Sequence, residues 1–354
     1  MALFLVNDDA ADTAQDLVEL GAHTVVVADA VMRDVYARAR RLARADVPVA
    51  IQGETGTGKE LVALALHVFS ARAGGPFVAI NCAAIPESLA EAELFGHARG
   101  AFTGAIAPRA GQLEEASGGT LFLDEVADLS LAMQARLLRA LECGEVRRLG
   151  ESAARRIDVR VVCASHRRLR DEVAAGRFRE DLYYRLGVAQ LELPPLRERP
   201  RDLAALSARF VEGACARMGR RPLRLSAATT RALEVRRWSG NVRELRHVLE
   251  CAVALTDDDA RELAPWHLPA ELTQAGATDA TAARTAGTAT AAPGGSFRPI
   301  TEELEELERR RMIEALRASD GVHVHAARLI AMPGRTFATK LRRYAIGDGE
   351  WKTT

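Results

Sequence analysis

Two groups of residues in this 354-residue chain have the types and spacing needed to bind and cleave a nucleoside triphosphate. The first reads GETGTGK over residues 53–59 and fits G-x-x-x-x-G-K, in which backbone N–H groups and one lysine surround phosphates. The residues expected to contact the nucleotide are Gly53, Glu54, Thr55, Gly56, Thr57, Gly58, Lys59 and Glu60. The generic motif places Ser or Thr after the lysine to bind Mg²⁺. Glu60 stands there instead, so the loop's metal contact is left to Thr57 or to water.

The second group is the carboxylate pair Asp124 and Glu125, which follows the apolar run in TLFLDE. Ligands of open α/β sheets bind at the carboxyl ends of the strands, where this pair is expected to lie. Asp124 is predicted to hold Mg²⁺ through water, and Glu125 to polarise the water that attacks the γ-phosphate. The alternative is that both carboxylates only cap the following helix.

Short apolar runs that alternate with helical periodicity predict a parallel sheet covered on both faces, an α/β fold. The expected strands are 47–52, 77–80, 120–124, 159–164 and 188–193, and the expected helices between them include 29–44, 60–72 and 131–142. No strand pattern is evident from 196 to 267. Helices expected over 201–218, 226–236 and 242–255 therefore predict a small all-helical subdomain after the sheet.

The rest of the chain divides into a linker and a basic helical unit. Residues 269–299 are rich in Ala, Thr and Gly and carry few large apolar side chains, which predicts a flexible linker. Residues 317–347 hold six basic residues against one acidic residue. Two short helices are expected there, separated by a turn at 332–334, a helix-turn-helix pattern. A basic three-helix dimerisation domain is the alternative.

The segment GAFTGA lies between the two nucleotide-site motifs, with Gly96, Gly100 and Gly104 as hinges and Phe102 at an expected exposed tip. Its residues are Gly100, Ala101, Phe102, Thr103, Gly104 and Ala105. This sequence, at this place between the two motifs, resembles the sigma-54-contacting loop of bacterial enhancer-binding proteins, which are AAA+ transcription activators. The resemblance runs from about residue 24 to 268, and residues 300–347 resemble the Fis-type DNA-binding domain. It implies an AAA+ ATPase subdomain at 24–195, a helical lid at 196–268 and the DNA-binding domain at 300–347. Residues 1–23 are then expected to be a short stub, too short for a domain of its own, and 269–299 the linker.

The resemblance also implies roles for single residues. Asn81 matches the "glutamate switch" residue that restrains the catalytic glutamate, and Arg243 matches the sensor II arginine. Arg179 and Arg185 match the arginine fingers that reach the ATP of a neighbouring subunit. The sensor I position usually reads Thr-Asn, whereas Ser165-His166 stands here, with His166 expected to donate to the γ-phosphate or to water.

In the Fis-type domain, the resemblance places residues of the second helix on DNA. Those expected to face the major groove are Arg335, Thr336, Thr339 and Lys340, with Arg342 and Arg343 nearer the phosphates.

The expected function is ATP-driven, Mg²⁺-dependent opening of promoter DNA by sigma-54 RNA polymerase holoenzyme. The protein is expected to be a ring, most simply a hexamer, bound to upstream double-stranded DNA. Zero formal net charge means that any DNA-binding surface is local. The five cysteines are scattered without disulfide or metal-ligand spacing, and no apolar run is long enough to span a bilayer. Both features favour the cytoplasm. Either a regulatory protein acts in trans or an N-terminal sensory part is missing. Two rivals are a DNA-binding regulator that has lost remodelling activity and an AAA+ machine that remodels another protein.

Overall fold

The computed structural model describes residues 17–21, 23–102, 104–257, 260–269, 300–319, 321–330, 332, 334–344 and 346. The chain divides into two compact units, residues 1–284 and 285–354, and each is considered by itself. Among the described residues, no helix combines the length and apolar character that crossing a bilayer requires.

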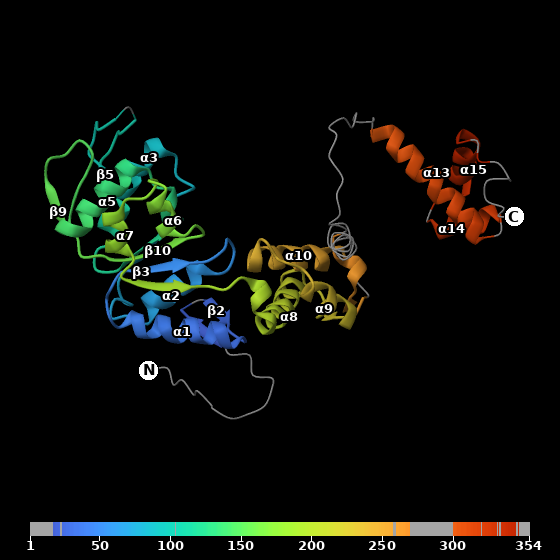
Figure 1. Cartoon of the computed structure of the whole chain (residues 1–354), viewed down its shortest axis with the longest axis horizontal. Helices are drawn as coiled ribbons and strands as arrows, with labels where there is room; N and C mark the ends of the chain where they lie inside the picture. The colour runs from blue at the N-terminus through green and yellow to red at the C-terminus, as the bar shows by residue number, and fades with distance from the viewer. Residues whose placement is uncertain are drawn as a thin grey trace, which may run out of the picture. The chain divides into compact units, whose positions relative to one another are not determined.

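A five-stranded parallel sheet forms the centre of the first unit, as the alternating pattern predicts (Figure 1). Its strands are β3 (Val49–Gln52), β4 (Phe77–Asn81), β7 (Thr120–Asp124), β10 (Arg160–Ser165) and β11 (Ala189–Glu192). Their spatial order is β11-β3-β10-β7-β4. β3 and β4 are consecutive strands of this sheet along the chain, but β10 and β7 lie between them in space. The chain therefore crosses over between them, and ligands of open α/β sheets bind near such crossovers.

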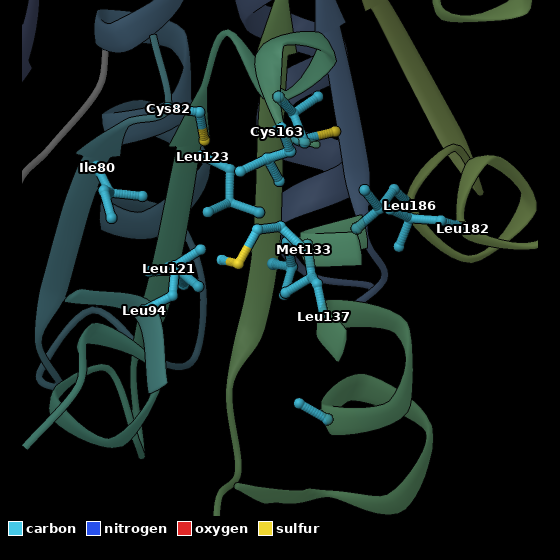
Figure 2. Close-up of a cluster of buried hydrophobic side chains, with 14 of the residues drawn as sticks. Ile80, Cys82, Leu94, Leu121, Leu123, Met133, Leu137, Cys163, Leu182 and Leu186 are labelled. Carbon is cyan, nitrogen blue, oxygen red and sulfur yellow. The ribbon is translucent and has the colours of Figure 1, made fainter. Parts of the chain in front are cut away.

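Alternate residues of the strands pack into two separate apolar cores, one on each face of the sheet. Phe122 and Val162 pack with side chains of α1 (Ala30–Ala43) and α2 (Lys59–Val68). Leu121 and Cys163 point to the other face and pack with α5 (Leu131–Cys143) and α7 (Glu180–Leu186), as Figure 2 shows. Burial on both faces explains why the strands read as continuous apolar runs.

Three two-stranded antiparallel ladders surround the central sheet. They pair β1 (Leu17–Leu20) with β2 (His23–Val26), β5 (Gly96–His97) with β6 (Arg109–Ala110), and β8 (Glu145–Arg147) with β9 (Ala154–Arg156). Short helices complete this part: α3 (Glu87–Phe95), α4 (Gln112–Glu115) and α6 (Leu169–Ala174). The first ladder spans the boundary expected at residue 24, and Leu20 is buried in the core beneath α1, so the folded part begins before that boundary.

A helical subdomain follows the sheet, but it is not purely helical. Its helices are α8 (Pro200–Arg217), α9 (Ala227–Glu234) and α10 (Asn241–Leu255). The expectation of no strands is wrong in detail, because β12 (Arg224–Leu225) pairs in parallel with β13 (Glu262–Leu263). Two-residue strands leave no alternation for a sequence pattern to detect. The buried indole of Trp238 packs at the centre of this subdomain and donates to the Leu233 carbonyl at 2.8 Å.

The second unit contains α13 (Ile300–Ala318), α14 (His323–Leu329) and α15 (Gly334–Arg343). Met312, Leu316 and Phe337 are fully buried between these helices. The expected flexible linker lies almost wholly outside the described residues.

Candidate functional site

Four neighbouring strands, β3, β10, β7 and β4, deliver polar residues to the same edge of the sheet. In the β4–β7 register Asn81 pairs with Asp124, and in the β10–β3 register Ser165 pairs with Gln52. Because parallel strands end at one edge, Gly53, Asn81, Glu125 and His166 emerge there together.

The phosphate-binding loop lies between β3 and α2, where the sequence predicts it. Gly56 and Gly58 have φ values of 79° and 102°, a left-handed conformation that glycine adopts without strain. The buried Lys59 Nζ donates to the Gly53 carbonyl at 3.0 Å and lies 3.4 Å from Glu125 Oε1. The lysine is therefore inside the loop, next to the carboxylate pair.

The hydroxyl of Thr57, the residue of the loop expected to contact the metal, is already hydrogen-bonded within the loop. Thr57 is buried, its hydroxyl donates to the Glu54 carbonyl at 2.8 Å, and its own carbonyl accepts from Arg199 at 3.0 Å. Glu60 occupies the first turn of α2. Of the two alternatives that the sequence leaves open, this arrangement favours water over Thr57.

The carboxylate pair ends β7. Asp124 is the last strand residue, and Glu125 takes a left-handed conformation, with φ 52° and ψ 48°. Glu125 Oε2 accepts hydrogen bonds from His166 Nδ1 at 2.6 Å and from the His166 backbone N–H at 3.1 Å. Asn81 Nδ2 lies 3.5 Å from Asp124 Oδ2, and Asn81 Oδ1 accepts from the N–H groups of Ala83 and Ala84.

The two carboxylates have opposite pKa shifts. Burial raises the pKa of Asp124, and the adjacent Glu125 charge raises it further, against the opposing effect of Lys59. Burial alone would raise the pKa of Glu125 too, but its hydrogen bonds from His166 and the charge of Lys59 outweigh burial and lower it. The charge of Asp124 is thus only partly compensated, and a cation beside it would stabilise the ionised carboxylate.

The residues present fit Mg²⁺ held in the manner usual for nucleotide enzymes. Among the described residues, no group of three or more His, Cys, Asp and Glu could hold a metal ion. Mg²⁺ in such sites uses one or two carboxylates, several waters and the substrate phosphates. Asp124 is suited to be that carboxylate.

The helical subdomain closes over the phosphate loop through contacts that sequence reasoning missed. Glu54 pairs with Arg197 at 2.7 Å, which lowers the pKa of the Glu54 carboxyl. The buried Asn241 donates to the Thr55 carbonyl at 3.0 Å and accepts from the Leu196 N–H at 2.7 Å. Arg243, the expected sensor II residue, is exposed on the first turn of α10 beside this contact. The sequence WSGNVREL indicates a turn before α10. It does not indicate that Asn241 donates to a carbonyl of the phosphate-binding loop.

Both expected arginine fingers are exposed at α7. Arg179 is the residue before the helix and pairs with Asp181 at 2.7 Å, whereas Arg185 donates to the Leu141 carbonyl at 2.9 Å. The fully buried Gln134 of α5 accepts from the Arg179 N–H at 2.8 Å. These contacts fix the backbone at Arg179 and leave the side chain at the surface.

The GAFTGA segment connects β5 to β6. The Gly100 N–H donates to the Ala105 carbonyl at 2.8 Å. Phe102 is 39% exposed, and its ring makes a T-shaped contact with the His97 ring, with 5.0 Å between the centroids. Phe102 is therefore neither a fully exposed tip nor a core residue. The neighbouring Ile106 is 84% exposed. Thr103 lies outside the described residues.

A second hairpin braces this loop and was not expected from the sequence. Leu149, in the turn between β8 and β9, donates to the Gly96 carbonyl at 2.9 Å and accepts from the Ala98 N–H at 2.8 Å. Arg148 anchors the turn through a two-bond ion pair with Glu114. The base of the GAFTGA loop is thus tied to the segment that leads into β10 and His166.

In the second unit, Thr336, Thr339, Arg342 and Arg343 are exposed on α15. The ammonium of Lys340, expected to face the major groove, pairs with Glu308 of α13, which also accepts from the Tyr344 hydroxyl at 2.6 Å. Lys340 is therefore held within the unit. The side chain of Arg335 lies outside the described residues.

Comparisons with known proteins agree with this geometry. Residues 25–192 match the Sigma-54 interaction domain, residues 197–285 the AAA+ ATPase lid domain, and residues 303–344 the family of Fis-type bacterial regulatory proteins. In fold, the chain resembles NtrX from Brucella abortus in complex with ADP, with a TM-score of 0.66 and 31% identity. That likeness covers 91% of this chain and 70% of NtrX.

Two relatives place the chain among transcription regulators. It is 48% identical over 296 residues to the nitric oxide reductase transcription regulator NorR1 of Cupriavidus necator. The matched region covers 82% of this chain and 58% of NorR1. It is 42% identical over 321 residues to the transcriptional regulatory protein FlbD of Caulobacter vibrioides. This matched region covers 91% of this chain and 70% of FlbD. The chain thus spans less than two thirds of NorR1. With these three domain matches and the nucleotide-site geometry, the chain belongs to the family of sigma-54-dependent transcriptional activators, with an AAA+ domain, its lid and a Fis-type helix-turn-helix.

Proposed function

We propose that this protein hydrolyses ATP to ADP and phosphate in a homo-oligomeric ring, with Mg²⁺, and uses the cycle to open promoter DNA held by sigma-54 RNA polymerase. The observation that carries the proposal is the position of Glu125, between Lys59 and His166 at the carboxyl edge of the sheet. A water-polarising carboxylate next to the phosphate-binding lysine is what phosphoryl transfer to water requires.

Each part of the site has a role in this reaction. The backbone N–H groups of residues 53–60 and Lys59 would hold the phosphates. Mg²⁺, when bound at Asp124, would neutralise phosphate charge. Glu125 would accept a proton from the attacking water, and Arg179 or Arg185 of a neighbouring subunit would offset the charge that develops in the transition state. Supply of that arginine in trans makes hydrolysis depend on ring assembly, most simply a hexamer.

The GAFTGA loop is proposed to transmit hydrolysis to sigma-54. Gly100 and Gly104 have φ values of 80° and 106°, and a Cβ at either would meet no atom within 4 Å. Both positive φ values favour glycine, which allows the loop to turn at these two positions. Thr103 and Phe102 lie between these hinges, and α15 of the second unit would bind upstream double-stranded DNA.

The first test is open-complex formation by sigma-54 holoenzyme on closed and on premelted promoter DNA, with purified protein and ATP. We expect Thr103→Ala to keep ATP hydrolysis and lose opening, because only the contact to sigma-54 is removed. Glu125→Gln should bind ATP, hydrolyse it on the order of 100-fold more slowly, as expected when a general base is lost, and also lose opening.

Ala107→Ser, an exposed change in the same loop outside the six-residue motif, is the matched control and should open promoters normally. Normal opening by Thr103→Ala would contradict the loop assignment. ATP hydrolysis without opening by the unmodified chain would favour another client protein, and ATP binding without hydrolysis would favour a DNA-binding regulator that has lost remodelling activity. A regulatory protein in trans would be revealed by activity that appears only in its presence.

A further inference from the structure

The carboxylate of Glu125 is held by a residue other than the one that the family resemblance implies. Its Oε2 accepts two hydrogen bonds from His166, at 2.6 Å from Nδ1 and 3.1 Å from the backbone N–H. Its Oε1 lies 3.4 Å from Lys59 Nζ. The side chain is largely buried, at 12% exposure, so these contacts define its position.

Asn81 is engaged elsewhere. Its Oδ1 closes a local turn by accepting from the N–H groups of Ala83 and Ala84, at 3.0 and 3.2 Å. Its Nδ2 points to Asp124, 3.5 Å from Oδ2. The amide is thus held in place by its own turn and directed at the proposed metal-binding carboxylate.

The backbone on both sides fixes the contact between His166 and Glu125. The Ser165 carbonyl accepts from the Gly53 N–H at 3.3 Å, and the Ser165 hydroxyl accepts from the Arg167 N–H at 3.0 Å. These bonds hold the residues on either side of His166. The left-handed backbone at Glu125 turns the chain at the end of β7, which neighbours β10 in the sheet.

We propose that His166 is the positioning residue for Glu125 and that Asn81 positions Asp124, a division of roles that rests on the proposed ATP hydrolysis. Without the imidazole, the carboxylate retains one backbone donor and the lysine ammonium, and it can turn towards Lys59. A carboxylate paired with that lysine is a poorer acceptor for the proton of the attacking water.

The contact itself is tested in the nucleotide-free protein by thermal unfolding. We expect the fall in Tm for His166→Ala plus Glu125→Ala to be smaller than the sum of the two single falls, because each single change already breaks the same bond. The matched control is the pair His166→Ala and Asn81→Ala, whose falls should add. Additivity in the first pair would overturn the proposal, whether or not the protein hydrolyses ATP.

The division of roles is tested by steady-state hydrolysis with the full chain. His166→Ala should lower kcat about 10-fold, the lower range for a general-base effect, with the KM for ATP within about twofold. His166→Asn, whose amide donor takes the place of Nδ1, should recover most of that loss. Asn81→Ala should raise the Mg²⁺ concentration needed for half-maximal rate and keep most of kcat at saturating Mg²⁺.

Two results of the hydrolysis assays would also overturn the proposal. One is a rise in KM for ATP with unchanged kcat in His166→Ala, which would make His166 a phosphate contact only. The other is a loss of kcat at saturating Mg²⁺ in Asn81→Ala without a shift in the Mg²⁺ requirement. A wild-type chain that hydrolyses no ATP would instead contradict the proposed function, and the Tm experiment would still decide whether His166 holds Glu125.

Discussion

At the scale of single residues, Gln134 connects the core of the ATPase domain to an expected arginine finger. Its amide donates to the carbonyls of Leu129 and Arg177 at 2.8 and 3.0 Å, and its oxygen accepts from the Arg179 N–H at 2.8 Å. We predict that Gln134→Leu lowers the free energy of unfolding by roughly 2–4 kcal/mol, because buried polar groups left unpaired cost about 1–3 kcal/mol each. It should also lower ATP turnover by the proposed ring on the order of 10-fold through displacement of Arg179.

Chemical denaturation measures the first effect, and hydrolysis at a protein concentration that maintains the ring measures the second. Gln134→Glu keeps the acceptor for Arg179 and should therefore lose stability but retain more of the turnover. Normal turnover in a destabilised Gln134→Leu variant would show that Gln134 has no part in placing Arg179.

The sequence predicted which residues lie together at the edge of the sheet better than it predicted their contacts. Lys59, Asp124 and Glu125 were found because the loop and the carboxylate pair have local patterns, and the structure brings them together. The contact of His166 with Glu125 joins residues 41 apart, and that of Lys340 with Glu308 joins residues 32 apart. No local pattern records such pairs, since they depend on how strands and helices pack.

At the scale of elements, the phosphate loop and the start of α10 are packed with no room for a side chain at Gly56. Gly56 has φ 79°, its carbonyl accepts from the Val242 N–H at 2.9 Å, and a Cβ there would lie 2.3 Å from the Gly240 carbonyl oxygen. We predict that Gly56→Ala weakens binding of a non-hydrolysable ATP analogue about 10-fold or more. A strained backbone costs about 1–3 kcal/mol, and 1.4 kcal/mol is tenfold in a binding constant.

Isothermal titration measures this affinity. Gly74→Ala is the matched control, because Gly74 is exposed and a Cβ there meets no atom within 4 Å. Equal affinities of the two variants would mean that the loop binds phosphates independently of its contact with α10.

The elements that the sequence predicted are those long enough to carry a period. The five central strands lie within two residues of their expected bounds, because burial on both faces makes each a continuous apolar run. The ladders β5–β6, β8–β9 and β12–β13 were missed, since strands of two or three residues leave no such signal. The ladder β1–β2 was missed too, because its first strand lies in the expected stub. The brace on the GAFTGA loop belongs to this missed group.

At the scale of the whole molecule, charge is balanced overall and concentrated locally. The chain has 48 basic and 48 acidic residues, yet residues 317–347 hold six basic residues against one acidic residue. Only three of the 48 basic residues are lysines, and two of them, Lys59 and Lys340, lie against a carboxylate. A neutral molecule gains no long-range attraction to DNA from its net charge, so we expect the proposed DNA affinity to depend on the arginines of the second unit.

This division predicts different effects for two neighbouring residues of α15. Arg342 is exposed, so Arg342→Ala should weaken binding to duplex DNA and lower the slope of log K against log salt by about 1, the value for one phosphate contact. Lys340 joins α15 to Glu308 of α13, so Lys340→Met should lower the thermal stability of the second unit. It should leave the salt slope nearly unchanged at temperatures where that unit is folded.

Fluorescence anisotropy at several salt concentrations measures the slopes, and thermal unfolding measures the stability. A full unit of slope lost in Lys340→Met, with no change in stability, would return Lys340 to the DNA-contacting surface.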